Sequence, residues 1–253
     1  MLMPSESRKC RGLNCSSTDL IKAHIIPQGF ARLLQKHGKS IDLSQEKIAY
    51  AKRPMGLFDP SILCKACDGK LGQYDQYALE ACKGFGSSHV NHGSEFVWPD
   101  VDGEKIAKFV LSVLWRASIS RRPELKEVDF GKKFEPIARD VLFGNKSLST
   151  FSQFAVLPIR MVDAHFGAEG IEGFYTTPYM MKSGDLRLYS FALSGFKFVA
   201  KVDSRYFDMM LRPYLLRAGE SIRGPFMELV DLNEFDSILQ MKLAQIRRGH
   251  SLD

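Results

Sequence analysis

The clearest hydrophobic pattern in the chain lies between residues 104 and 118. Apolar side chains recur there at intervals of three and four positions, at Ile106, Phe109, Val110, Val113, Leu114 and Ala117. This spacing brings all six onto one face, so it predicts a helix over 104–118 whose apolar face packs in the core. Weaker patterns predict further helices at 28–36, 68–83, 205–216 and 232–248.

Runs of aliphatic, β-branched and aromatic residues predict the strands. They occupy residues 19–26, 48–51, 154–159, 173–181, 186–193 and 196–202. The last two runs are separated only by Ser194-Gly195, a pair typical of a hairpin turn. We therefore expect the second half of the chain to be α+β, with a mainly antiparallel sheet.

The segment 84–93 is rich in glycine and serine and is the best candidate for a boundary. We expect a smaller module over 1–98, which includes this linker, and a larger α+β module over 99–253. Residues with the character of a site lie before the boundary, apart from His89 and His92 within it. Those two histidines are candidates for an additional metal ligand.

The net charge of the chain, +6 at pH 7, suits a phosphate-bearing partner. Residues 1–98 hold 13 Lys/Arg against 9 Asp/Glu, so most of the excess lies in the smaller module. Many soluble proteins carry a similar charge, so it does not identify nucleic acid by itself. No apolar run approaches the roughly 18 residues that span a bilayer, and the first residues lack an apolar signal region. We therefore expect a cytoplasmic protein with no membrane partner.

Four cysteines occur as two pairs, Cys10-x4-Cys15 and Cys64-x2-Cys67. Two such pairs supply four thiolates for one tetrahedral zinc ion, so we expect structural zinc that stabilises the smaller module. A redox dithiol at the second pair is the alternative, although no βαβ pattern precedes it. Cys82 lies in a helical pattern and is expected to be a small buried apolar residue. Pairs of this kind also indicate a reducing compartment.

His24 lies nine residues after Cys15 in the sequence Ala-His-Ile-Ile-Pro, and Asp68 follows Cys67 directly. Together with the two cysteine pairs, these residues resemble the HNH (ββα-metal, His-Me finger) endonucleases of the four-cysteine zinc-knuckle type. The resemblance covers residues 8–83, roughly a third of the chain. It implies a zinc-bound, treble-clef-like ββα-metal module that hydrolyses phosphodiester bonds in nucleic acid.

The resemblance also implies roles for single residues. His24 corresponds to the general base that activates water, and Asp68 corresponds to a ligand of a catalytic Mg²⁺ or Mn²⁺ ion. Asp59 stands five residues before the second cysteine pair, where the family has an asparagine that orients the base. Ala23 departs from the family, because a metal ligand is expected at that position. Asp75 is expected two helical turns beyond Asp68, too far to share a metal with it.

Each of these residues also has a simpler interpretation. His24 could bond to backbone beside the cysteine knuckle, and Asp68 could be a carboxylate stabilised by the start of its helix. Asp59 could be a turn residue before Pro60. Five basic residues near the motif could contact phosphates, most simply those of DNA, or could be solvated surface charges. They are Lys22, Arg32, Lys36, Lys65 and Lys70.

Two other functions stay open at this point. The chain could be a catalytically degenerate, zinc-stabilised module that binds nucleic acid without cutting it. It could also be a regulator or inhibitor, for example from a defence system or a mobile element, that binds a protein partner through residues 99–253. The nearly neutral charge of that module, 22 Lys/Arg against 20 Asp/Glu, motivates the last alternative.

Overall fold

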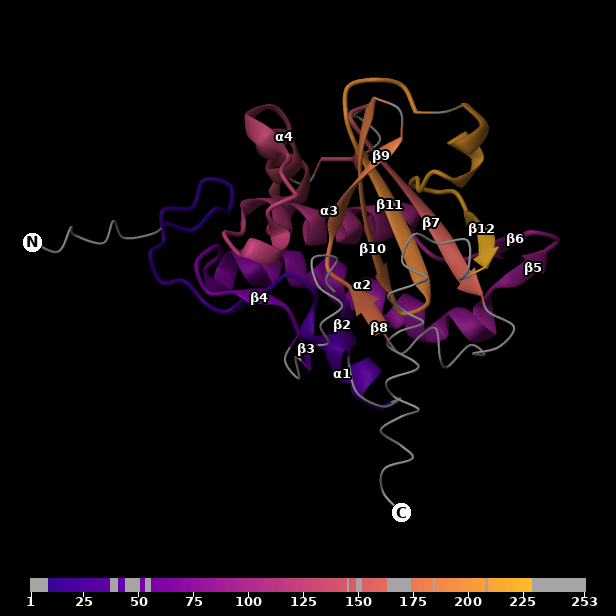
Figure 1. Cartoon of the computed structure of the whole chain (residues 1–253), viewed down its shortest axis with the longest axis horizontal. Coiled ribbons are helices and arrows are strands. Elements are labelled where there is room, and N and C mark those ends of the chain that lie inside the picture. The colour runs from indigo at the N-terminus through magenta and orange to yellow at the C-terminus, as the bar shows by residue number, and fades with distance from the viewer. Residues whose placement is uncertain are drawn as a thin grey trace, which may run out of the picture.

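The structure is a computed structural model of the chain. It describes residues 9–36, 41–43, 51–52, 56–144, 146–148, 152–162, 174–183, 185–207 and 209–228. Within these ranges the protein is a mixed α+β fold whose sheets are mostly antiparallel, which confirms the predicted fold class at this level (Figure 1). None of the described helices is long and apolar enough to cross a membrane.

The helices and strands of the described residues follow in chain order. The α-helices are α1 (Gln28–Lys36), α2 (Lys65–Ser88), α3 (Gly103–Ile119) and α4 (Gly131–Phe143), with 3-10 helices η1 (Pro123–Leu125) and η3 (Met209–Tyr214). The early strands are β1 (Ala23–His24), β2 (Ile41–Leu43), β3 (Ala51–Lys52), β4 (Phe58–Asp59), β5 (Val90–His92) and β6 (Glu95–Trp98). The later strands are β7 (Phe154–Val162), β8 (Phe174–Thr176), β9 (Tyr179–Ser183), β10 (Leu186–Leu193), β11 (Phe196–Val202) and β12 (Ile222–Glu228).

One large sheet forms most of the second half of the protein. Its strand order is β3-β2-β8-β10-β11-β7-β12-β6-β5, and β9 also pairs with β10. Most pairs are antiparallel, whereas β7–β12 and β2–β8 are parallel. The predicted hairpin between β10 and β11 is confirmed, because Ser194 and Gly195 both adopt the left-handed backbone that a tight two-residue turn requires.

Helix α3 packs against one face of this sheet (Figure 1). The ring of Phe109 lies 6.4 Å from that of Phe191 and 6.2 Å from that of Phe198. Asp102 precedes the first residue of the helix, and its side chain accepts hydrogen bonds from the N–H groups of Glu104 and Lys105. The predicted helix over 104–118 is therefore confirmed. More than the predicted apolar face is buried: α2 and α4 also pack against this helix, so nearly all of its residues are buried.

Several predicted elements differ from the structure. The run 173–181 is interrupted after Thr176, because Thr177-Pro178 separates β8 from β9 and proline has no N–H to donate to a ladder. The strand predicted over 19–26 is reduced to β1 and an isolated bridge from Leu20 to Cys64. Where a helix was predicted at 205–216, the described residues form only η3, which contains Pro213. No sequence pattern predicted α4, β5, β6 or β12. Residues 48–50 and 232–248 lie outside the described residues.

The predicted boundary at 84–93 is not an irregular linker. Helix α2 continues to Ser88, and the next residues form a β5–β6 hairpin that turns at Gly93. Phe85 explains this, because its buried ring packs edge-on against Phe196 and Trp98. One cluster of buried side chains contains residues from both sides of the boundary. The division into modules 1–98 and 99–253 stays a prediction.

Candidate functional site

The four paired cysteines come together, as their spacing predicts. The thiol sulfurs of Cys10, Cys15, Cys64 and Cys67 all lie within 4.8 Å of one another. The sulfurs of Cys15 and Cys64 are 3.7 Å apart. Two sulfurs that each lie about 2.3 Å from a tetrahedral ion are about 3.8 Å apart, so the spacing fits a zinc site. The cluster could bind a metal ion and is compatible with structural zinc.

Local backbone geometry explains how the sulfurs converge. Asn14 adopts a left-handed conformation in the turn between the first two cysteines, and Cys64 precedes the first turn of α2. The N–H groups of Gly12 and Cys64 donate to Cys10 Sγ at 3.4 and 3.3 Å. A side chain at Gly12 would be excluded, since a Cβ there would lie 2.4 Å from Cys67 Sγ. The knuckle therefore requires glycine at this position.

The thiols differ in acidity. Burial raises the pKa of Cys10 and of Cys67. Burial also acts to raise the pKa of Cys64, but hydrogen bonds from the Cys67 N–H and from the other thiols outweigh it and lower this pKa to about 7. A thiolate is the form that binds metal, so the cluster holds one thiol that ionises readily.

The cysteine cluster fastens the segment that carries His24 to the start of α2. Arg11 donates through its N–H to the carbonyl of Ile62, and Ile21 donates to that of Leu63, both at 2.9 Å. Cys82 lies apart from the cluster, where it is partly buried against the hydrophobic core, in line with its predicted role. The position of the His24 strand thus depends on the geometry of the four sulfurs.

His24 and Asp68 line the same cavity, of about 190 Å³. Strand β1 pairs with β4 and places His24 opposite Phe58, with the two rings 6.0 Å apart. The cavity is bounded by the start of α1, one face of α2, and one residue of α3. Its lining residues are His24, Pro27, Gln28, Gly29, Asp68, Gly72, Asp75, Gln76, Leu79 and Arg116. The structure therefore brings together the predicted base and the predicted helix carboxylate.

Asp68 lies in the first turn of α2, and one of its carboxylate oxygens is buried. This oxygen, Oδ1, has no hydrogen-bond partner among the described residues. Burial raises the pKa of Asp68, and the negative charge of Asp75 adds to this effect, whereas Arg116 and His24 act in the opposite direction. The carboxylate is therefore short of compensating positive charge within the cavity.

Asp75 and Arg116 form a buried ion pair in the wall of this cavity. The guanidinium donates to both carboxylate oxygens, at 2.9 and 2.8 Å, and the Arg116 side chain is 1% exposed. Its remaining donors reach the carbonyl and hydroxyl of Ser112. The sequence indicated that Asp75 lies too far along α2 to share a metal with Asp68, and no sequence pattern had identified Arg116. A charged residue inside a predicted core helix was the available signal, because a buried arginine requires a carboxylate partner.

Asp59 occupies a different environment from the one the resemblance implies. It lies opposite Ala23 in the β1–β4 pair, and its carboxylate accepts hydrogen bonds from Ser61 N, Ser61 Oγ, Ser120 Oγ and Arg121 N. Burial acts to raise the pKa of Asp59, but these four hydrogen bonds outweigh it and lower the pKa. The residue joins the turn after β4 to the end of α3. Its geometry supports this structural role rather than the orientation of His24.

The predicted basic residues whose side chains are described are exposed and do not line the cavity. Lys22, Arg32, Lys65 and Lys70 are exposed, while the side chain of Lys36 lies outside the described part of the chain. Arg122 was not among the predicted basic residues, and it donates to the Phe58 carbonyl at 2.9 Å.

Phe58 carries two cations beside His24. The Lys22 ammonium lies 5.6 Å from the centre of the Phe58 ring, and the Arg122 guanidinium lies 6.0 Å from it. The sequence signal for this contact was the adjacent pair Arg121 and Arg122, shortly after the predicted helix over 104–118. Together, Lys22, Phe58 and Arg122 form a cationic surface beside His24, in which the Arg122 guanidinium is also paired with Glu124 at 2.7 Å.

The two histidines of the 84–93 segment do not line the cavity. His89 stacks on Phe85 with the ring centres 4.1 Å apart, and its Nδ1 lies 2.6 Å from the Phe85 carbonyl oxygen. His92 is exposed on β5. Ala23 is completely buried. Among the described cavity residues, the carboxylate that could replace the ligand at position 23 is Asp75, and it is bound to Arg116.

No protein-family model, curated protein or solved structure matches the chain.

Substitution of Gly12 by alanine tests the metal centre. Gly12→Ala should displace the Cys67 sulfur, reduce the zinc content below one ion per chain and lower the melting temperature. Gly69→Ala is the matched control, because it adds the same methyl group to α2 where no atom lies within 4 Å. This control should keep its zinc and gain up to about 1 kcal/mol of stability. Zinc stoichiometry by mass spectrometry and thermal unfolding measure both effects. Unchanged zinc content in Gly12→Ala would contradict the proposed packing.

Substitution of Asp75 by asparagine tests the buried ion pair. Asp75→Asn should lower the free energy of unfolding by about 3–5 kcal/mol, because it leaves the Arg116 charge buried without a counter-ion. Glu220→Gln removes the carboxylate of an exposed pair with Arg217, 3.6 Å apart. That control should cost less than about 1 kcal/mol. Urea unfolding of both variants gives the comparison, and equal losses would argue against a special role for the α2–α3 pair.

Proposed function

We propose that the protein is a zinc-stabilised, metal-dependent endonuclease of the HNH type that hydrolyses phosphodiester bonds in nucleic acid, most simply DNA. The observation that supports this most directly is the shared cavity of His24 and Asp68 beside the four-cysteine cluster. These residues are far apart in the sequence and line one cavity, which supports a shared role for them.

Structural zinc would hold the smaller module together in a treble-clef-like form. Two of the four sulfurs come from the knuckle before β1, the other two come from Cys64 and the first turn of α2, and a bridge from Leu20 to Cys64 links the two segments. A site with four protein ligands has no open position, so this ion would stabilise the fold without taking part in hydrolysis. Its contribution would be to fix the distance between the β1 strand and α2.

His24 would act as the general base. A neutral imidazole accepts a proton near neutral pH, and a base must lie within hydrogen-bond reach of the water that it activates. The His24 side chain is half-buried at a cavity large enough for water and part of a phosphate group. The ring would take a proton from water as the oxygen attacks phosphorus.

Asp68 would hold a catalytic Mg²⁺ or Mn²⁺ ion together with water and the phosphate of the substrate. Magnesium is commonly bound by only one or two carboxylates plus substrate phosphates, so a single free carboxylate is a workable donor set. The buried Oδ1 of Asp68, with no partner among the described residues, fits this role. When bound, the ion would neutralise charge that develops on the phosphate.

The cationic surface of Lys22, Phe58 and Arg122 would contact the nucleic-acid backbone next to the scissile phosphate. Arg32, Lys65 and Lys70 would add further phosphate contacts around the cavity. Contacts to phosphate position a nucleic acid without reading its sequence, and they weaken as salt concentration rises. Binding should therefore depend strongly on salt and weakly on sequence.

A catalytically degenerate nucleic-acid-binding module is the second candidate. Two observations favour it: Ala23 offers no ligand, and the second carboxylate of the cavity, Asp75, is bound to Arg116. This alternative keeps the zinc cluster and the cationic surface and differs only in the absence of cleavage.

Nicking of supercoiled plasmid in Mg²⁺ or Mn²⁺ distinguishes the two candidates. His24→Ala should lower the rate by about 100-fold or more, the range typical of general-base removal, while duplex binding persists. Asp68→Asn should have a similar effect without unfolding, because the amide has the size of the carboxylate and carries no buried charge. His92→Ala is the control, since that side chain is exposed on β5, and it should cut at the wild-type rate.

The outcomes separate clearly. Folded, zinc-loaded wild type that binds labelled duplex but leaves plasmid intact would support the degenerate module. Wild type that neither binds nor cuts would overturn both candidates. Cleavage that survives in His24→Ala and Asp68→Asn would place the chemistry elsewhere.

A further inference from the structure

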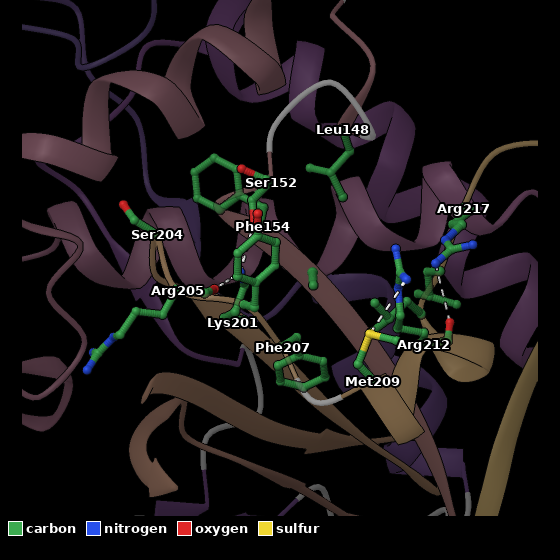
Figure 2. A pocket seen from close by; sticks show the side chains of 14 residues that line it. Leu148, Ser152, Phe154, Lys201, Ser204, Arg205, Phe207, Met209, Arg212 and Arg217 are labelled. Carbon is green, nitrogen blue, oxygen red and sulfur yellow. Dashed lines mark hydrogen bonds between the residues drawn. The ribbon is translucent and has the colours of Figure 1, made fainter. Parts of the chain in front are cut away.

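A second, larger cavity of about 580 Å³ lies far from His24 in the sequence, between β7, β11 and the segment that follows β11. Its volume is within the roughly 300–1,000 Å³ of small-molecule sites. Phe154 and Phe207 lie near its centre in Figure 2, and the buried side chains of Leu148 and Leu216 add to the apolar lining.

The cations of this cavity are not equivalent. Lys201 is buried and donates to the carbonyls of Ser152 and Arg205 at 2.8 and 2.6 Å, so it belongs to the wall. Arg205 is bound through its guanidinium to the carboxylate of Asp203. Figure 2 shows the end of the Arg205 side chain directed away from the two phenylalanines.

Arg212 and Arg217 remain as cations that a ligand could use, and Figure 2 shows them on the same side of the cavity. Arg212 is exposed and, within the described ranges, has no carboxylate partner; its contact is with Met209 Sδ at 3.8 Å. Arg217 lies 3.6 Å from Glu220 in an exposed pair, which water screens strongly. No carboxylate is present among the described lining residues, so the cavity is suited to an anion.

Aromatic side chains complete the cavity. Tyr206 lines it and is 96% exposed, and Met209 and Met210 beside it are also largely exposed. A phenol ring that stays in water at the edge of an apolar cavity presents a face on which a planar group can stack. Stacking of bases on aromatic rings combined with arginine contacts to phosphate is how proteins bind single nucleotide units.

We propose that this cavity binds a nucleotide, with its base stacked among Phe154, Tyr206 and Phe207 and its phosphate on Arg212 and Arg217. The ligand is either a free nucleoside phosphate or one unit of a single strand, since both present the same base and phosphate. The site is separate from the His24 cavity and does not depend on the endonuclease proposal.

Calorimetric titration of the full chain tests this proposal with four probes: ATP, adenosine, inorganic triphosphate and an eight-residue single-stranded oligonucleotide. ATP should bind at least about tenfold more tightly than adenosine or triphosphate, because only ATP uses both the aromatic and the cationic part. Arg212→Ala and Tyr206→Ala should each weaken binding by roughly tenfold. Both side chains are exposed, so these variants should fold normally.

Two control variants make the result specific. Lys83→Ala removes an exposed charge of α2 that does not line the cavity, and it should bind like wild type. His92→Ala changes an exposed residue of β5 that lines neither cavity, and it should also bind like wild type. Oligonucleotide binding without ATP binding, with the same sensitivity to Arg212→Ala and Tyr206→Ala, would identify a single strand as the source.

Three outcomes would overturn the proposal. Triphosphate that binds as tightly as ATP would show an anion site without a base. Binding that persists unchanged in both Arg212→Ala and Tyr206→Ala would place the ligand elsewhere. If neither ATP nor the oligonucleotide binds, the cavity is not a nucleotide site, and its exposed aromatic edge would instead suit a protein partner.

Discussion

The convergence of four cysteine sulfurs is the constraint on which the candidate site depends. Cys15 and Cys64 are separated by 48 residues, and their sulfurs lie 3.7 Å apart. Backbone hydrogen bonds to the Ile62 and Leu63 carbonyls accompany this approach, but few of them link the two segments. A metal ion that binds the folded arrangement and not the extended chain would supply folding free energy directly. The relative position of His24 and Asp68 would then be as well defined as the metal coordination.

A second constraint comes from charge. Asp68, Asp75 and Arg116 share one cavity, and the single guanidinium is bound to Asp75. The buried Oδ1 of the remaining carboxylate, Asp68, has no hydrogen-bond partner in the described part of the chain, which is costly in a folded protein unless a ligand or proton compensates it. Structural ion pairs and candidate catalytic groups thus lie side by side, and the arginine of α3 determines which of the two aspartates is available to a ligand.

Features encoded by short-range spacing were predictable from the sequence. The cysteine pairs, the helix over 104–118 and the turn at Ser194-Gly195 each depend on residues a few positions apart. The partners of Asp59 and Arg116 were not predictable, because Ser120 and Asp75 are about 40 to 60 residues away from them. The glycines of 84–93 suggested a break in the helix. Burial of Phe85 against the sheet stabilises the helix by more than glycine, a poor helix former, destabilises it. Within the run 173–181, Pro178 was the sequence signal for an interruption, and the pairing of β8 and β9 with β10 defines where each strand ends.

Helix α2 has a mechanical consequence. It contains 24 residues, so it is about 36 Å long. Cys67 lies in its first turn, Asp75 is bound to α3 near its middle, and Phe85 packs into the aromatic cluster under the sheet near its end. A rod fixed at three points along its length cannot rotate about its axis or slide at one end alone. Any movement of α2 that reshapes the His24 cavity must therefore either bend this helix or shift its contacts with α3 and the sheet at the same time.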